Sequence, residues 1–253
     1  MWNTSLFLVL VTSSLMVLLI GIPRQVHAIG RLRKLPAGAV QATTIFGILQ
    51  NLIFSVIAAI LGILFGRQAD LHAPVFESIA SRLSPLGAIQ TQLVPSIAIG
   101  IISGFIFVGL YFGVFRPQVD KDTAILTERL RLEMGLPTRV LIGGIHEEIV
   151  FRWGVMGFFA WIGLKIFGDT TPLVMWISII LAGLIFGLAH LPGTATLGIE
   201  PFRALIISSL SLNLLAGTVF GWLFWQYGLL AAMIAHALFH VIFFPFERHI
   251  IDR

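Results

Sequence analysis

Cysteine is absent from the 253-residue sequence, and charged residues make up only 11% of it. Without cysteine the chain can form no disulfide, cannot bind zinc through thiolates and has no cysteine nucleophile. Soluble domains carry about 25% charged residues, so this scarcity of charge excludes an ordinary soluble globule. Apolar residues dominate instead, at 57% of the chain with a mean hydropathy of +0.97. Such a composition is typical of a polytopic membrane protein.

Seven apolar stretches are each long enough to cross a hydrocarbon core of roughly 30 Å. They cover residues 4–22, 39–65, 93–115, 138–164, 172–190, 204–224 and 228–246. The sequence therefore predicts an all-α fold, a polytopic transmembrane helical bundle of about seven spans. We expect residues 1–253 to form a single transmembrane domain of a multi-pass protein in the cell membrane.

The basic residues are distributed unevenly between the loops. Twelve of the 16 Lys and Arg residues fall on one side of a seven-span chain, three fall on the other, and Arg152 lies within a span. The twelve are Arg24, Arg31, Arg33, Lys34, Arg116, Lys121, Arg129, Arg131, Arg139, Arg203, Arg248 and Arg253. Because cytoplasmic loops carry the excess of positive charge, we predict an external N-terminus and a cytoplasmic C-terminus. No RNA or DNA motif accompanies the net charge of +4, so no nucleic-acid partner is predicted.

Two further segments have predicted roles outside the spans. Residues 1–122 contain the first three spans and carry no motif. Residues 123–136 mix apolar and charged residues at helical spacing, which predicts a helix on the cytoplasmic interface, with a solvated linker as the alternative. The RLRK run at residues 31–34 is an orientation signal or a contact for anionic lipid. Glycine pairs four residues apart predict close helix packing: Gly62/Gly66, Gly100/Gly104, Gly109/Gly113, Gly183/Gly187 and Gly217/Gly221.

The most unusual stretch is IGGIHEEIVFRW at residues 142–153, inside the fourth predicted span. A charge near the bilayer centre costs roughly 2.5 to 3.5 kcal/mol, so buried ionisable groups mark a functional site by default. Glu148 and Arg152 are four residues apart and can pair on one helix face. Glu147 points about 100° away and has no such partner in its own helix. We predict that Glu148–Arg152 is a structural pair and that Glu147 is free to accept a proton.

Three histidines lie at comparable depth in other spans. His190 ends the fifth predicted span, and His236 and His240 lie four apart in the seventh, so these two share a face. His190 is shallower than the other two unless the fifth span continues past Pro192. We expect the three imidazoles and Glu147 to converge, which supplies a base and donors for an oxyanion. His146 flanks Glu147 but points elsewhere, and we predict a structural role for it.

These residues form three blocks in chain order. The blocks are Glu147-Glu148-x-x-x-Arg152, Phe186-x-x-x-His190 and His236-x-x-x-His240. Their order and spacing resemble the CPBP family, which comprises CAAX prenyl proteases and bacteriocin-processing or immunity (ABI) proteins. The resemblance covers residues 138–246, which would be the CPBP-like catalytic core. It implies a glutamate-dependent intramembrane endopeptidase.

The resemblance also implies roles for the individual residues. Glu147 would activate a water with the help of His190, and His236 and His240 would stabilise the oxyanion. The family pattern has asparagine where this chain has His240. Because two histidines four apart also resemble zinc-ligand spacing, a zinc site of Glu147, His190, His236 and His240 is the alternative to the favoured metal-free mechanism.

The predicted function is hydrolysis of a peptide bond by glutamate-activated water in a cavity that opens to the cytoplasm. The expected partners are the lipid bilayer and a peptide or protein substrate, and prenylated or membrane-bound substrates are among the options. One alternative is a non-catalytic membrane immunity or scaffold protein with a structural polar cluster. A proton-coupled transporter is the other, and the absence of inverted repeats argues against it.

Overall fold

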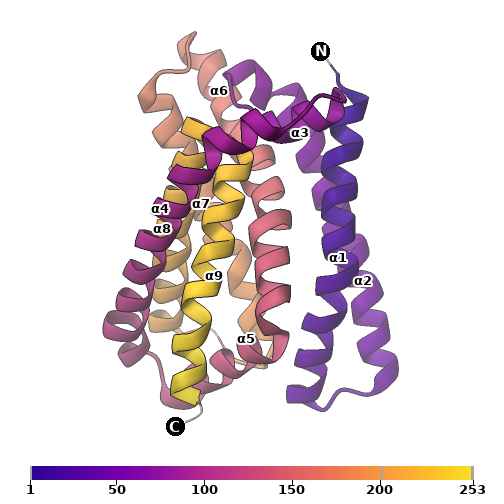
Figure 1. Ribbon diagram of the computed structural model, residues 1–253. Coiled ribbons are helices and arrows are strands. Elements are labelled where there is room, and N and C mark those ends of the chain that lie inside the picture. Colours follow the sequence, from indigo (N-terminus) through magenta and orange to yellow (C-terminus); the bar gives the residue numbers. More distant parts are fainter. Residues whose placement is uncertain (1, 201, 252–253) are drawn as a thin grey trace.

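The computed structural model describes residues 2–200 and 202–251, except for the side chains at 192, 194 and 195. Arg253, which the orientation argument counts, lies outside these residues. The described chain is helical throughout, with short turns between helices (Figure 1). Its elements are α1 (Thr4–Arg33), α2 (Ala37–Leu64), η1 (Gly66–Ala69), α3 (Pro74–Ala80), α4 (Leu86–Leu110), η2 (Tyr111–Phe115), η3 (Arg116–Gln118), α5 (Lys121–Leu141), η4 (Ile142–Glu147), η5 (Ile149–Met156), α6 (Gly157–Phe167), α7 (Pro172–Thr196), α8 (Arg203–Tyr227) and α9 (Leu229–Ile251).

Seven helical segments of the described chain are long and apolar enough to cross a membrane. The prediction of an all-α bundle of about seven spans is therefore confirmed, and its orientation in the membrane stays a prediction. Figure 1 places the N-terminus and the C-terminus at opposite ends of the bundle, as an odd number of spans requires. The chain is thus a multi-pass membrane protein.

Several helices extend beyond the apolar stretches. The helix α1 continues to Arg33, eleven residues past the predicted end of its span, because charged side chains in a headgroup region do not interrupt a helix. The helix α7 continues to Thr196, which places His190 within a helix rather than at its end. The segment predicted as an interfacial helix is part of α5, which bends at Gly135, where φ is 77°.

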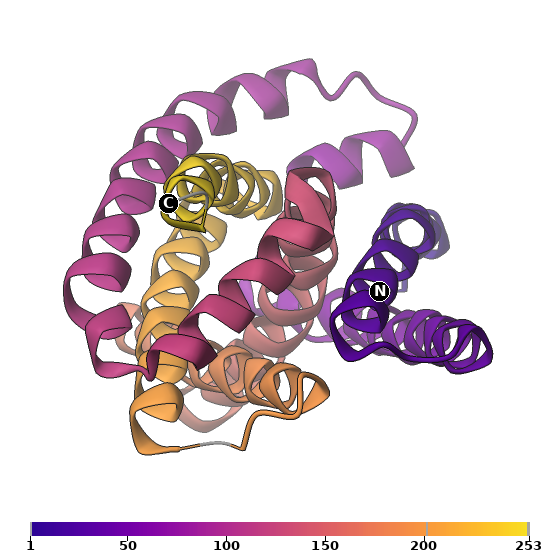
Figure 2. The same ribbon diagram turned by 90° about the horizontal axis from the view of Figure 1, so that it is seen from below.

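The fourth span lies at the centre of the bundle. It runs from α5 through η4 and η5 to α6, and it packs against α1 and α2 on one side and against α7 and α9 on the other. In the view from below, the pair α1 and α2 forms a separate hairpin beside this span (Figure 2). The span that carries the ionisable cluster therefore contacts helices on both sides within the bundle.

A buried ionic network joins α5 to the end of α9. Glu247 is fully buried and accepts hydrogen bonds from Arg131 and Arg139. Arg131 also donates to the Tyr111 hydroxyl at 2.9 Å, and that hydroxyl donates to Glu128 at 2.9 Å. Sequence reasoning counted these arginines only as orientation signals, because their partners come from distant parts of the chain.

Most of the glycine pairs lie at helix contacts. A Cβ built on Gly62 would lie 2.2 Å from the Trp153 indole nitrogen, and one on Gly154 would lie 2.7 Å from the Ala58 Cα atom. The prediction of close packing is wrong for Gly109 and Gly113, since nothing lies within 4 Å of either Cβ position. These two glycines face away from the bundle, and spacing alone does not distinguish an inward pair from an outward one.

Substitution by valine should therefore destabilise the protein at Gly154 but not at Gly109. Gly154→Val should destabilise the protein by about 1–3 kcal/mol or more, because the side chain meets the backbone of α2 and cannot be accommodated by rotamer changes. Gly109→Val is the matched control and should leave the thermal unfolding midpoint in detergent within about 1 °C of the parent. Equal unfolding midpoints for the two variants would contradict the packing of η5 on α2.

Candidate active site

The segment that carries the paired glutamates is π-helical rather than α-helical. The hydrogen bonds of η4 and η5 follow the i→i+5 pattern on both sides of Glu148. Single π-turns occur frequently at functional sites because they widen the helix and change the direction of side chains. Here two consecutive π-segments place His146, Glu147 and Glu148 towards three different parts of the bundle.

Glu148 is held between two cationic or ionisable partners. Its side chain is fully buried, and its Oε1 atom lies 2.7 Å from Nδ1 of His236 on α9. Its Oε2 atom lies 3.1 Å from Nε of Arg152, at ion-pair distance but without good hydrogen-bond alignment. Sequence spacing indicated the arginine, whereas the histidine partner comes from a span 88 residues away. Each oxygen of Glu148 thus lies against a basic side chain.

The guanidinium of Arg152 packs between aromatic rings. It lies 4.7 Å from the ring centroid of Phe186 and 5.6 Å from that of Phe220. Cation–π contacts of this kind contribute about 2 kcal/mol when desolvated. Arg152 is only 1% exposed, so its charge depends on nearby protein groups, which include Glu148 and the two rings.

Glu147 differs from its neighbour in exposure and in partners. Its side chain is 20% exposed, and its Oε1 atom lies 3.9 Å from Nε2 of His190, beyond hydrogen-bond distance. Among the described residues, the Glu147 carboxylate has no hydrogen-bond partner. The Nδ1 atom of His190 lies 2.8 Å from the Phe186 carbonyl and donates to it, which turns Nε2 towards Glu147. The site therefore holds one paired and one available carboxylate.

Two imidazole nitrogens converge on the space beside Gly143. A Cβ atom at Gly143 would lie 2.6 Å from Nε2 of His240 and 3.0 Å from Nε2 of His236. The two rings stack with their centroids 5.0 Å apart. Gly143 precedes Glu147 by about one helical turn in η4. Sequence reasoning missed Gly143, because glycine in a membrane helix usually indicates only close packing.

His146 belongs to a separate polar cluster. Its Nδ1 atom lies 2.7 Å from Ser14 Oγ and 3.2 Å from Ser55 Oγ, and its Nε2 atom lies 3.1 Å from Asn51 Oδ1. All its nitrogens thus have partners on α1 and α2, the helices that form the N-terminal hairpin. The polar positions Asn51 and Ser55, four apart in an apolar span, were the available sequence signal for this contact.

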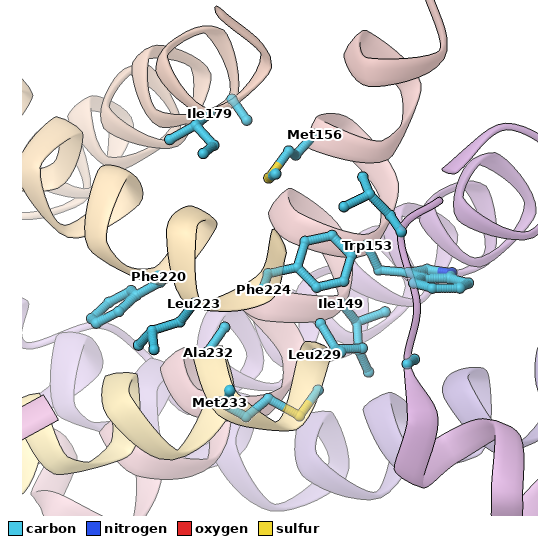
Figure 3. Close-up of a cluster of buried hydrophobic side chains, with 14 of the residues drawn as sticks. Ile149, Trp153, Met156, Ile179, Phe220, Leu223, Phe224, Leu229, Ala232 and Met233 are labelled. Carbon is cyan, nitrogen blue, oxygen red and sulfur yellow. The ribbon is translucent and has the colours of Figure 1, made fainter. Parts of the chain in front are cut away.

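An apolar core closes the bundle beyond the ionisable groups. Figure 3 shows side chains from η5, α7, α8 and α9 that meet in one cluster. Along η5 these residues follow Glu148, and along α9 they precede His236, so the cluster lies on the α6 side of the site. Trp153, Phe220 and Phe224 fill it with aromatic rings.

The four residues of the alternative zinc site do not form a ligand set. Among the described residues, no group of three or more His, Cys, Asp and Glu side chains is arranged to hold a metal ion. One ring nitrogen of His236 already bonds Glu148, and Glu147 and His190 face each other at 3.9 Å. Four tetrahedral zinc ligands require bond lengths near 2.0–2.2 Å to a common centre. The residues therefore do not fit the zinc alternative in this arrangement.

The protein is thus a multi-pass helical bundle that carries carboxylate and imidazole side chains within its membrane spans. Residues 132–242 match the family described as type II CAAX prenyl endopeptidase, Rce1-like. This part of the chain is a domain of that family, within which the CPBP motifs fall, and membership implies a peptidase. No curated protein and no solved structure matches the chain.

The pairing of Glu148 predicts how the protein responds to loss of Arg152. Arg152→Ala leaves a buried carboxylate without half of its compensation, which should cost on the order of 3–5 kcal/mol. We expect a clear fall in the yield of folded protein and in the thermal unfolding midpoint. The control is Arg67→Ala, which removes a half-exposed pair with Glu77 and should change stability by less than about 1 kcal/mol. A normal unfolding midpoint for Arg152→Ala would contradict the structural role.

Proposed function

We propose that the chain is an intramembrane endopeptidase in which Glu147 activates the water that cleaves a peptide bond. The observation that supports this most is the contrast between two adjacent carboxylates. Glu148 is buried and paired on both oxygens, whereas Glu147 is partly exposed and faces His190. A carboxylate with unused acceptor capacity near an accessible space is the group that can take a proton from water.

The proposed reaction uses the space beside Gly143. Glu147 removes a proton from a water, and the resulting hydroxide bonds to the carbonyl carbon of the substrate. The carbonyl oxygen becomes an oxyanion, which Nε2–H groups of His236 and His240 can stabilise. Glu148 balances the charge of an imidazolium at His236, the form in which both ring nitrogens carry protons.

Collapse of this intermediate requires a proton for the leaving amine. The proton on Glu147 passes to the amine nitrogen directly or through His190, whose Nε2 atom faces Glu147. The C–N bond then breaks, and the products are a carboxylate and an amine. The Phe186 carbonyl, which accepts from Nδ1 of His190, keeps that ring in orientation during the transfer.

The surroundings of the site support a substrate that approaches within or beside the membrane. The apolar core closes the α6 end, so a peptide enters from the opposite end, which we propose is cytoplasmic, or laterally from the lipid. The substrate is a peptide or protein whose cleavable bond can unwind at this depth. Prenylated and other membrane-bound substrates both meet this condition.

The decisive experiment compares carboxylate variants of the purified protein on a peptide library, with and without a chelator. Glu147→Gln and Glu147→Ala should lower the cleavage rate at least about 100-fold, the range for loss of a general base. Glu133→Gln is the control and should retain full activity, since its exposed carboxylate lies outside the site. Cleavage that persists in folded Glu147→Gln would reject the mechanism and favour the non-catalytic membrane protein.

The space beside Gly143 allows a second test. Gly143→Ala places a methyl group where the two Nε2 atoms converge, and we expect cleavage to fall at least about tenfold because the oxyanion position is displaced. Gly193→Ala, on the same end of the bundle with nothing within 4 Å of the added Cβ, should retain activity. Full activity in Gly143→Ala would show that the oxyanion does not bind there.

A further inference from the structure

The last third of α1 leaves the hydrocarbon region of the membrane. A helix of 30 residues is about 45 Å long at 1.5 Å per residue, whereas the hydrocarbon core is roughly 30 Å thick. The residues from Pro23 to Arg33 therefore lie at the level of the lipid headgroups or beyond. They belong to the same end of the bundle as most of the basic residues.

A cavity of 610 Å³ lies between this part of α1 and the bend in α5. Its α1 wall is formed by Pro23, Arg24, His27 and Arg31, and its α5 wall by Glu133, Met134, Gly135 and Pro137. Gly135 adopts φ 77° and ψ 155°, which interrupts α5 and leaves the first turn of the continuing helix at the cavity wall. The cavity thus depends on the bend rather than on a loose contact between two straight helices.

The charge of the cavity is positive. Arg24, His27 and Arg31 occupy positions i, i+3 and i+7, one face of a helix. Glu133 is the single acid in the lining, and it already pairs with Arg31 at 2.9 Å. Among the described residues, Arg24 has no hydrogen-bond or ion-pair partner. An arginine in this setting can bind a phosphate through two of its N–H groups.

A second cavity of 460 Å³ adjoins the first at His27. Its other lining residues come from the first turns of α2, namely Ala37, Val40, Gln41, Thr44 and Ile45. The Thr44 hydroxyl donates to the carbonyl of Val40 at 2.8 Å and is turned towards its own helix. The residues that line the second cavity therefore include no Lys, Arg, Asp or Glu, in contrast to those that line the first.

We propose that these two cavities form one binding site for an anionic phospholipid. The phosphate of the headgroup binds Arg24 and Arg31 in the first cavity, and the upper part of an acyl chain lies in the second. A basic and an apolar cavity that meet at one residue, at headgroup depth, match the two chemical parts of such a lipid. Anionic lipids are concentrated in the cytoplasmic leaflet, on which the predicted orientation places this end.

The test measures lipid binding to the detergent-purified full chain by native mass spectrometry, with thermal unfolding as a second readout. Phosphatidylglycerol, phosphatidylcholine and inorganic phosphate are the three ligands. Arg24→Gln removes the free cation, and Gln41→Trp fills the apolar cavity from an exposed position. Lys34→Gln is the matched control, because it removes one charge from the same end of α1 outside the cavity lining.

The parent protein should bind phosphatidylglycerol more tightly than phosphatidylcholine and gain thermal stability from it. Arg24→Gln should weaken phosphatidylglycerol binding about tenfold. Gln41→Trp should also weaken it, and Lys34→Gln should change it less than about twofold.

Equal weakening of phosphatidylglycerol binding by Lys34→Gln and Arg24→Gln would overturn the proposed site and indicate general attraction of anionic lipid to a basic surface. If inorganic phosphate stabilises the protein as much as phosphatidylglycerol does, and Gln41→Trp has no effect, the ligand is a soluble anion. That result would overturn the proposal of a lipid ligand. The readouts need no cleavage, so they are independent of the proposed peptidase activity.

Discussion

The arrangement of the candidate site depends on how one buried negative charge is compensated. Glu148 is fully enclosed, and an ion transferred from water into protein costs several kcal/mol unless partners offset the cost. Arg152 from the same helix and His236 from the last span supply that compensation. The neighbouring Glu147 is partly exposed, and its nearest ionisable partner is His190 at 3.9 Å. The two adjacent glutamates have the same side chain, so the difference in their exposure and partners comes from how each one packs in the bundle.

Close helix contacts hold the histidines in place around this pair. Gly143 lets the rings of His236 and His240 approach the fourth span, and Gly144 lies against the backbone of α9 at Met233. Glu247 joins α9 to α5 at the end of the same helix pair through two arginines. These contacts fix the rotation of α9, and that rotation places Nδ1 of His236 against Glu148.

The N-terminal hairpin lies outside the residues that match the family, yet it contacts the centre of the protein. Ser14 and Ser55 bond one nitrogen of His146, and Asn51 bonds the other. His146 directly precedes Glu147 in η4. Movement of α1 and α2 would therefore change the position of the free carboxylate. The lipid site proposed on α1 and α2 lies on this same hairpin.

Composition and periodicity predicted the helical architecture, but they did not predict which side chains from different spans meet at the candidate site. Long apolar runs predicted seven spans, because each run is comparable in length to the bilayer core. Helix ends were less accurate: α1 continues through Pro23 and Gly30 to Arg33, eleven residues past the predicted span. The spacing of Glu148 and Arg152 indicated a pair within one helix. The contact of Glu148 with His236 and the space beside Gly143 depend on packing between spans, which spacing within one helix does not determine.

Thermal unfolding of Glu147→Gln and Glu148→Gln in the same detergent tests the division between the two acids most directly. The substitution is isosteric, so the two variants differ only in which charge is lost. The account predicts that Glu148→Gln lowers the unfolding midpoint markedly, since Arg152 and His236 lose their shared partner, whereas Glu147→Gln leaves it nearly unchanged. Equal midpoints for the two variants, or a larger loss in Glu147→Gln, would contradict the account.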